Sequence, residues 1–124
     1  MRALEFITVA ALIEFMVLGG MVGWARGKFG IEAPATTGDP VFERYFRVHM
    51  NTLEALVVFL PALWIFAQRI SYWLAFFLGI VFIAGRALYA WGYINDPDQR
   101  AIGARATEFV NVVLVLGSLL GIIF

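Results

Sequence analysis

One face of the segment around residues 42–66 carries charged and amide side chains. Its members follow one another at spacings of three, four and three residues, which places them on a single stripe of an α-helix. They are Arg44, Arg47, Asn51 and Glu54. Guanidinium groups form paired hydrogen bonds with carboxylates, and charged side chains are costly in contact with lipid. This stripe must therefore face protein or a polar ligand.

A second polar stripe lies in the segment around residues 72–93. Arg86, Tyr89 and Tyr93 are again spaced by three and four residues, and Arg100 follows seven residues later. We expect the two stripes to meet at one depth, where arginines outnumber acids by two: Arg44, Arg47, Arg86 and Arg100 against Glu43 and Glu54. Unbalanced charge near a bilayer favours an anion with several carboxylates. For any single pair, such as Arg47 with Glu54, an ion pair that only holds helices together is the alternative.

The elements that position these stripes follow from composition. Apolar residues make up 62% of the 124 residues, and mean hydropathy is +0.85. A soluble domain of this size could not bury so much apolar surface, whereas lipid can cover it. Four segments are long enough to cross a bilayer: about 4–24, 42–66, 72–93 and 107–124. The sequence thus predicts an all-α integral membrane protein, an antiparallel bundle of four transmembrane helices forming one membrane domain over residues 1–124.

Several other classes are excluded by the same composition. Nine Lys and Arg balance nine Asp and Glu, so nothing indicates a nucleic-acid partner. The chain has no cysteine, so any thiol chemistry needs an external thiol. His49 is the only histidine and has no neighbouring ligand type, so we expect no metal site.

The positive charges also predict an orientation. Most arginines and lysines fall in or beside the connections 25–41 and 94–106, whereas the opposite side has only Arg2 and Arg69. Positive charge is retained in the cytoplasm. We therefore expect both connections to be cytoplasmic and both termini to lie on the opposite side.

Two motifs resemble those of the MAPEG family, the membrane-associated proteins of eicosanoid and glutathione metabolism. The first is Glu43-Arg44-x-x-Arg47-x-His49-x-Asn51-x-x-Glu54, and the second is Gly85-Arg86-x-x-Tyr89-x-x-Gly92-Tyr93 with Arg100 beyond it. The loop Thr36-Thr37-Gly38-x-Pro40 and Arg26 are also similar to the family pattern. The resemblance covers nearly the whole chain. It is strongest to the branch of microsomal glutathione transferases and leukotriene-C synthases.

The resemblance implies a homotrimer of four-helix subunits that binds glutathione between neighbouring subunits near the cytoplasmic face. The residues it implies for binding are Arg26, Arg47, Asn51, Glu54, Arg86, Tyr89 and Tyr93. Glutathione has two carboxylates for arginine and one ammonium group for Glu54. A lipophilic electrophile or a lipid hydroperoxide would enter from the membrane lipid.

By the same resemblance, Arg100 is the catalytic residue that activates the glutathione thiol. A free thiol has a pKa of about 8.5 and is only a few per cent thiolate at pH 7. Lowering this pKa by about two units takes about 2.7 kcal/mol, which one charge-assisted hydrogen bond can supply. Ala55 and Gly27 differ from the residues that eicosanoid-making relatives commonly have at these two positions. This difference favours a general transferase or peroxidase over the synthesis of a specific eicosanoid.

Two other functions fit parts of the sequence. A non-catalytic MAPEG member would bind lipid or a partner protein, but such relatives tend to lose the arginines that this chain retains. A small transporter would use Glu14, an ionisable group in the middle of the first span. Binding of glutathione distinguishes the first alternative from an enzyme, and proton-coupled efflux that depends on Glu14 would support the second.

Overall fold

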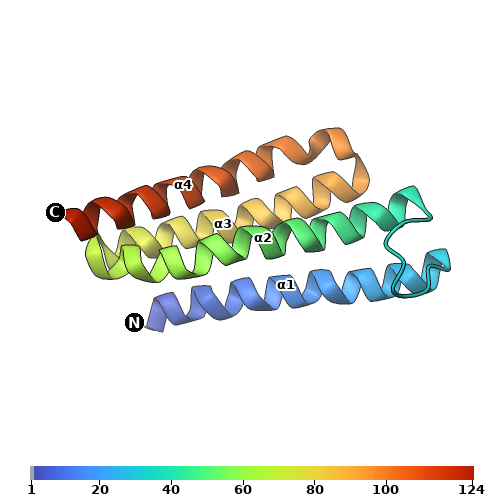
Figure 1. Ribbon diagram of the computed structural model, residues 1–124, viewed down its shortest axis with the longest axis horizontal. Helices are drawn as coiled ribbons and strands as arrows, with labels where there is room; N and C mark the ends of the chain where they lie inside the picture. The colour runs from blue at the N-terminus through green and yellow to red at the C-terminus, as the bar shows by residue number, and fades with distance from the viewer. Residues whose placement is uncertain (1) are drawn as a thin grey trace.

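The computed structural model describes residues 2–124, which form four long helices and one short one. The long helices are α1 (Arg2–Phe29), α2 (Pro40–Arg69), α3 (Tyr72–Asn95) and α4 (Ala101–Ile123). Each runs antiparallel to the next, so that both ends of the chain lie at the same end of the bundle (Figure 1). All four are long and apolar enough to cross a membrane. The predicted antiparallel four-helix membrane bundle is confirmed.

Local sequence signals set several helix ends. The carboxylate of Asp39 accepts hydrogen bonds from the backbone N–H groups of Val41 and Phe42, at 2.9 and 3.0 Å, and Pro40 is the first residue of α2. Ser71 caps α3 by accepting a hydrogen bond from the backbone N–H of Leu74. Such caps satisfy N–H groups that have no partner within the helix. They fix the residues at which α2 and α3 begin.

The helices extend beyond the spans expected from hydropathy. α1 continues to Phe29, and the connection expected over residues 94–106 is mostly helical. Between α3 and α4 lie only Asp96 and the 3-10 helix η1 (Pro97–Arg100). The reason is that hydropathy locates the stretch that crosses lipid, whereas good helix formers such as Ala and Arg continue a helix into the polar zone. Arg105 therefore lies within α4 rather than in a loop.

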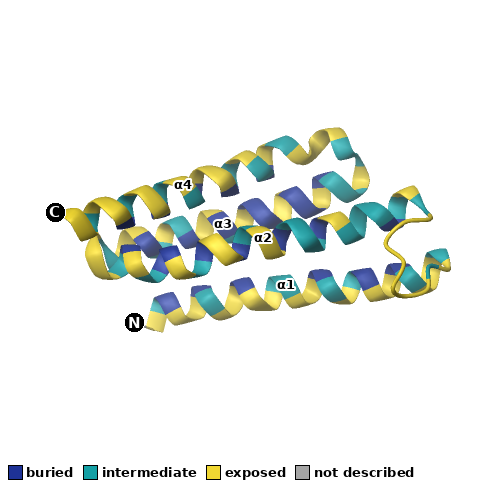
Figure 2. Ribbon diagram, in the orientation of Figure 1, coloured by how far each residue is buried: buried dark blue, intermediate teal, exposed yellow. Residues whose placement is uncertain are grey.

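The interior of the bundle has two parts. The part nearer the chain ends, here called the apolar half, is packed around Phe59 and Phe82, whose rings stack with centroids 3.8 Å apart. The part nearer the connections 30–39 and 96–100, here called the polar half, contains Arg86 with Tyr89. Buried residues line the inward faces in both parts, and exposed ones cover the outer faces (Figure 2). The polar half contains most of the residues that the sequence suggested for binding.

Candidate functional site

Arg86 lies at the centre of the polar half. Its side chain is buried, with only 4% of the residue exposed. Nε and Nη2 donate hydrogen bonds to Oγ1 of Thr52 at 3.3 and 3.0 Å, and Nη1 donates to Oγ1 of Thr107 at 3.1 Å. The guanidinium carbon lies 4.1 Å from the ring centroid of Tyr89. Three helices, α2, α3 and α4, therefore hold this cation in place.

Close contact between α3 and α4 makes this arrangement possible. A Cβ atom at Gly103 would collide with the backbone of Tyr89 and with the carbonyl oxygen of Gly85. One turn later on α4, the hydroxyl of Thr107 donates to the carbonyl oxygens of Gly103 and Ala104, at 3.2 and 3.0 Å. Because its hydrogen is used in this way, the oxygen is available to accept from the guanidinium group.

A hydrogen bond joins the two stripes that the sequence predicted. Asn51 on α2 donates through Nδ2 to the hydroxyl oxygen of Tyr89 on α3, at 2.6 Å. The ring of Tyr89 meets that of Tyr93 edge to face, with centroids 5.6 Å apart. The structure thus brings Asn51, Tyr89 and Arg86 into one connected group.

The other predicted residues lie nearer the surface of the single chain. Arg47, Glu54 and Arg100 are exposed, and the guanidinium carbon of Arg100 lies 5.4 Å from the ring centroid of Tyr93. Arg26 donates to the carbonyl oxygen of Ala35 at 2.7 Å, next to the connection between α1 and α2. One chain therefore does not gather all the predicted guanidinium groups around one point.

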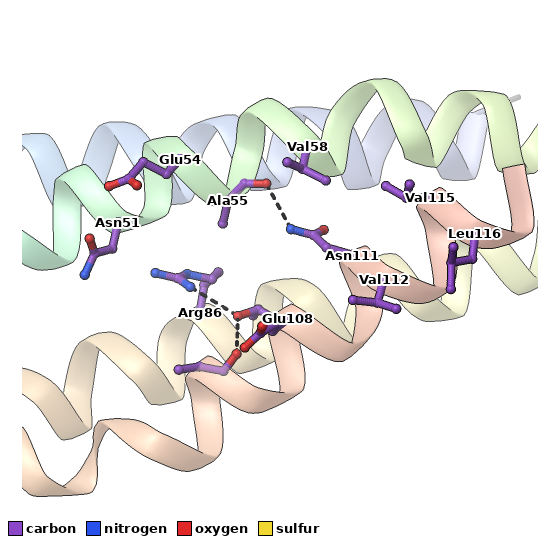
Figure 3. A pocket seen from close by; sticks show the side chains of 12 residues that line it. Asn51, Glu54, Ala55, Val58, Arg86, Glu108, Asn111, Val112, Val115 and Leu116 are labelled. Carbon is purple, nitrogen blue, oxygen red and sulfur yellow. Dashed lines mark hydrogen bonds between the residues drawn. The ribbon is translucent and has the colours of Figure 1, made fainter. Parts of the chain in front are cut away.

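A pocket of about 690 Å³ opens beside Arg86 between α2, α3 and α4 (Figure 3). One end of it is polar and is lined by Asn51, Glu54, Arg86 and Glu108. The other end is apolar and is lined by Val58, Val112, Val115 and Leu116. Between the ends, Nδ2 of Asn111 donates to the carbonyl oxygen of Ala55 at 3.2 Å. The pocket therefore suits a ligand with a charged part and an apolar part.

His49 lies where α1 and α2 meet. The ring of His49 stacks on that of Phe15 with centroids 4.4 Å apart, and its Nε2 lies 3.1 Å from the position that a Cβ at Gly19 would take. In the stretch from Arg2 to Phe124, no three His, Cys, Asp or Glu side chains are grouped so that they could hold a metal ion. His49 thus packs α2 against α1.

Three residues of the site were missed by the sequence analysis. Thr52 and Thr107 accept the hydrogen bonds of Arg86, and Glu108 lines the polar end of the pocket. A buried arginine needs acceptors on the helices around it. That requirement points to hydroxyl residues one helix away at the same depth, and Thr52 directly follows Asn51 in the first motif.

The fold and the pocket define a class, that of multi-pass integral membrane proteins with a polar site inside a helix bundle. Within this class, the sequence model of the MAPEG family matches residues 4–120. The chain belongs to the MAPEG family, and the resemblance seen in its motifs is confirmed.

Individual relatives are similar over most of the chain. An uncharacterized protein of Synechocystis sp., sll1147, is 45% identical over 118 residues, which is 95% of this chain and 86% of the relative. Microsomal glutathione S-transferase 2 of Homo sapiens is 40% identical over 101 residues, covering 82% of this chain and 69% of the relative. Leukotriene C4 synthase of Bos taurus is 32% identical over 99 residues, covering 80% and 66% respectively.

Proposed function

We propose that this protein is a membrane-bound glutathione transferase, which conjugates glutathione to lipophilic electrophiles and also reduces lipid hydroperoxides. The observation that carries the proposal is Arg86, a buried cation beside an open pocket. A guanidinium group has five N–H donors, and the three hydrogen bonds to threonine hydroxyls leave two for a ligand. Similarity to a glutathione transferase and a leukotriene synthase supports the choice of glutathione.

Glutathione would bind through its charged ends. In this proposal, Arg86 and Arg47 hold carboxylates, and Glu54 holds the ammonium group. The hydroxyl groups of Tyr89 and Tyr93 complete the binding site together with Asn51 and Arg26. Arg47, Glu54 and Arg100 are exposed in one chain. This exposure is what a site between neighbouring subunits of a homotrimer requires, because a second chain would cover them.

The chemistry would depend on a thiolate. Arg100 donates a hydrogen bond to the glutathione sulfur and stabilises its negative charge, so that the sulfur attacks an electrophilic carbon and the leaving group departs. With a hydroperoxide, the sulfur attacks the terminal oxygen and the alcohol leaves, after which a second glutathione yields the disulfide and water. The apolar end of the pocket, around Val58 and Val115, would hold the lipophilic partner.

Titration of the purified protein with glutathione by calorimetry tests this function first. We expect binding at or below millimolar glutathione, and turnover with a chlorodinitrobenzene-type electrophile or a hydroperoxide. No binding at millimolar glutathione would favour a lipid- or partner-binding role. Binding without turnover of either substrate would also contradict the proposed enzyme. A mass measurement in detergent tests the trimer, since three chains should remain associated.

The orientation of the chain in the membrane is also part of the proposal, with the connections 25–41 and 94–106 in the cytoplasm and the termini opposite. Because the chain has no cysteine, single cysteines can be introduced at exposed positions on either side, Thr37→Cys and Gln68→Cys. A thiol reagent that cannot cross the membrane should label Gln68→Cys in intact cells. Labelling of Thr37→Cys instead would show that the orientation is reversed.

A further inference from the structure

Half-buried Glu14 of α1, one of whose carboxylate oxygens is buried, has no role in the proposed reaction. Oε1 of Glu14 is inaccessible to solvent and has no hydrogen-bond partner among residues 2–124. A buried acceptor without a partner is costly, and a buried carboxylate without a cation is more costly still. In a helix that crosses lipid, such a group is expected to have a partner charge.

The packing of α1 places Glu14 at the level of Arg86. Ala11 and Leu18 lie three residues before and four residues after Glu14, and so on the same face of α1. Ala11 belongs to the packed cluster that contains Phe82, and Leu18 belongs to the cluster that contains Tyr89. Arg86 lies between Phe82 and Tyr89 on α3. This packing places Glu14 and Arg86 at one level of the bundle.

The helix that carries Glu14 does not line the pocket. α1 packs against α2 and α3, and α4 packs against the same two helices. In Figure 1, α1 and α4 lie at opposite edges of the bundle. The residues that line the pocket come from α2, α3 and α4. The helix that carries Glu14 therefore lies on one side of α3, and the pocket beside Arg86 opens on the other.

We propose that Glu14 is a positioning residue, the buried counter-ion that balances Arg86 and thereby sets how strongly the pocket attracts an anionic group. The hydrogen-bond partners of Arg86 within the described chain are neutral hydroxyls, which orient the guanidinium group without balancing its charge. Glu14 supplies the compensating negative charge from beyond hydrogen-bonding distance. The part of this inference that concerns an anionic ligand rests on the proposed binding of glutathione.

The charge balance has a consequence for binding and release. With Glu14 in place, Arg86 belongs to a neutral pair, so its attraction for a carboxylate in the pocket is moderate. Without Glu14, the remaining carboxylates around Arg86 are Glu54 and Glu108, which line the pocket with it. The net charge that an anionic ligand meets there becomes more positive by one unit, in a medium of low polarity. Removal of the Glu14 charge should therefore tighten the binding of glutathione, whereas loss of an ordinary binding residue would weaken it.

A double-mutant cycle on thermal unfolding tests the pair without any ligand. Glu14→Gln and Arg86→Gln should each lower the unfolding midpoint in detergent by about 5 °C or more, because each leaves a buried charge unbalanced. The double variant should lose clearly less than the two single losses together. Additive losses would overturn the pairing. Glu5→Gln, which removes an exposed carboxylate from the same helix, is the matched control and should leave the midpoint unchanged.

Titration with glutathione tests whether Glu14 sets how strongly the pocket attracts an anionic group. Glu14→Gln should lower the dissociation constant for glutathione about fivefold to tenfold, and Glu14→Asp, which keeps the charge, should restore a value near that of the wild type. An unchanged or higher dissociation constant in Glu14→Gln would overturn the effect on the pocket. If Glu14→Gln does not fold, a normal dissociation constant in Glu14→Asp together with folding of the double variant supports the pairing. If the wild type binds no glutathione, the proposed function fails, while the thermal cycle still decides the role of Glu14.

Discussion

The apolar and polar halves of the bundle use the same faces of the same helices for opposite purposes. Phe82 and Arg86 are four residues apart on α3, and Leu114 and Thr107 are seven residues apart on α4. In the apolar half, fully buried rings and aliphatic side chains fill the centre, with the rings of Phe59 and Phe82 only 9° from parallel. In the polar half, the centre is a cation held by hydroxyl groups.

The difference indicates that stability alone does not account for the polar half. Apolar side chains can be packed together without leaving any hydrogen-bonding group unpaired. A buried cation, in contrast, loses its hydration and needs several hydrogen-bond partners to replace it. Replacing buried charges with apolar side chains of similar size is often neutral or stabilising. A chain that keeps Arg86, Asn51 and Tyr89 at the centre of a membrane bundle therefore has a use for them other than folding.

The largest effect on stability should come from the apolar half. Phe82→Ala removes a fully buried ring that stacks on Phe59, and we expect a loss of about 3 to 5 kcal/mol in the free energy of unfolding. The activity per folded molecule should stay near the wild-type value, because Phe82 does not line the pocket. Unfolding in detergent by denaturant or heat, with turnover measured on the folded fraction, checks both expectations.

A matched exposed residue provides the control for this variant. Phe77→Ala removes a ring from the same helix that is 59% exposed, and it should cost far less. Equal losses in the two variants would mean that the outer surface of α3 is as tightly packed as its inner face. The difference in packing between the two halves would then depend on the whole assembly and not on the single chain.

The largest effect on activity should come from Arg100. Arg100→Ala removes the group proposed to stabilise the thiolate, so turnover with glutathione should fall about 100-fold, equivalent to about 2.7 kcal/mol. The unfolding midpoint should hardly change, because the side chain is exposed. The thiolate absorbance of bound glutathione measures the effect directly and should disappear in the variant.

A neighbouring arginine separates this role from general charge. Arg105→Ala also removes an exposed guanidinium group near the start of α4, and its thiolate signal should equal that of the wild type. Equal losses in Arg100→Ala and Arg105→Ala would mean that the local positive potential, rather than one hydrogen bond, stabilises the sulfur.

The fold was predictable from the sequence because few alternatives exist in lipid. Every backbone N–H and C=O group needs a hydrogen-bond partner within the bilayer. Four apolar segments that lack the alternating pattern of barrel strands can therefore only be helices. The start of α2 could also be predicted, since Asp39 before Pro40 is a strong start signal. The ends at Phe29 and Ala101 were not predictable in the same way, because hydropathy does not report where a helix stops outside lipid.

The site was predictable only where spacing carries the information. Asn51 and Tyr89 lie on their stripes by helical spacing, and a hydrogen bond joins them. Thr52 and Thr107 carry no charge and no diagnostic spacing, so their contact with Arg86 depends on the rotation of α2 and α4 about their axes. That rotation is set by close packing, such as the contact of Gly103 with α3, which the sequence alone does not specify.

A substitution at this contact should disturb the polar half selectively. In Gly103→Ala the new methyl group would meet the backbone of Tyr89 and the carbonyl oxygen of Gly85, so α3 and α4 must move apart at a cost of about 1 to 3 kcal/mol. The same movement pulls Thr107 away from Arg86. The binding of glutathione should therefore weaken together with stability, as calorimetry and thermal unfolding on the same sample would show.

A glycine that has space around it serves as the control. At Gly20 no atom lies within 4 Å of the added methyl group, so Gly20→Ala should leave stability and binding unchanged or slightly improve stability. A larger loss in Gly20→Ala than in Gly103→Ala would contradict the close contact of Gly103 with α3.

The smallest effect should come from the hydrogen bond between the two stripes. Tyr89→Phe keeps the ring beneath Arg86 and removes only the hydroxyl group that accepts from Asn51, so about 1 kcal/mol of stability should be lost. Asn51→Ala should cost a similar amount, and the double variant should cost less than the two single variants together, because both substitutions remove the same hydrogen bond.

Tyr45→Phe is the control, because its ring packs against Trp24 away from the pocket, and it should change neither stability nor binding. Additive losses from Asn51→Ala and Tyr89→Phe would show that this bond does not couple α2 to α3. The polar half would then consist of separate side chains around Arg86 rather than one connected group, and its contrast with the packed apolar half would be sharper still.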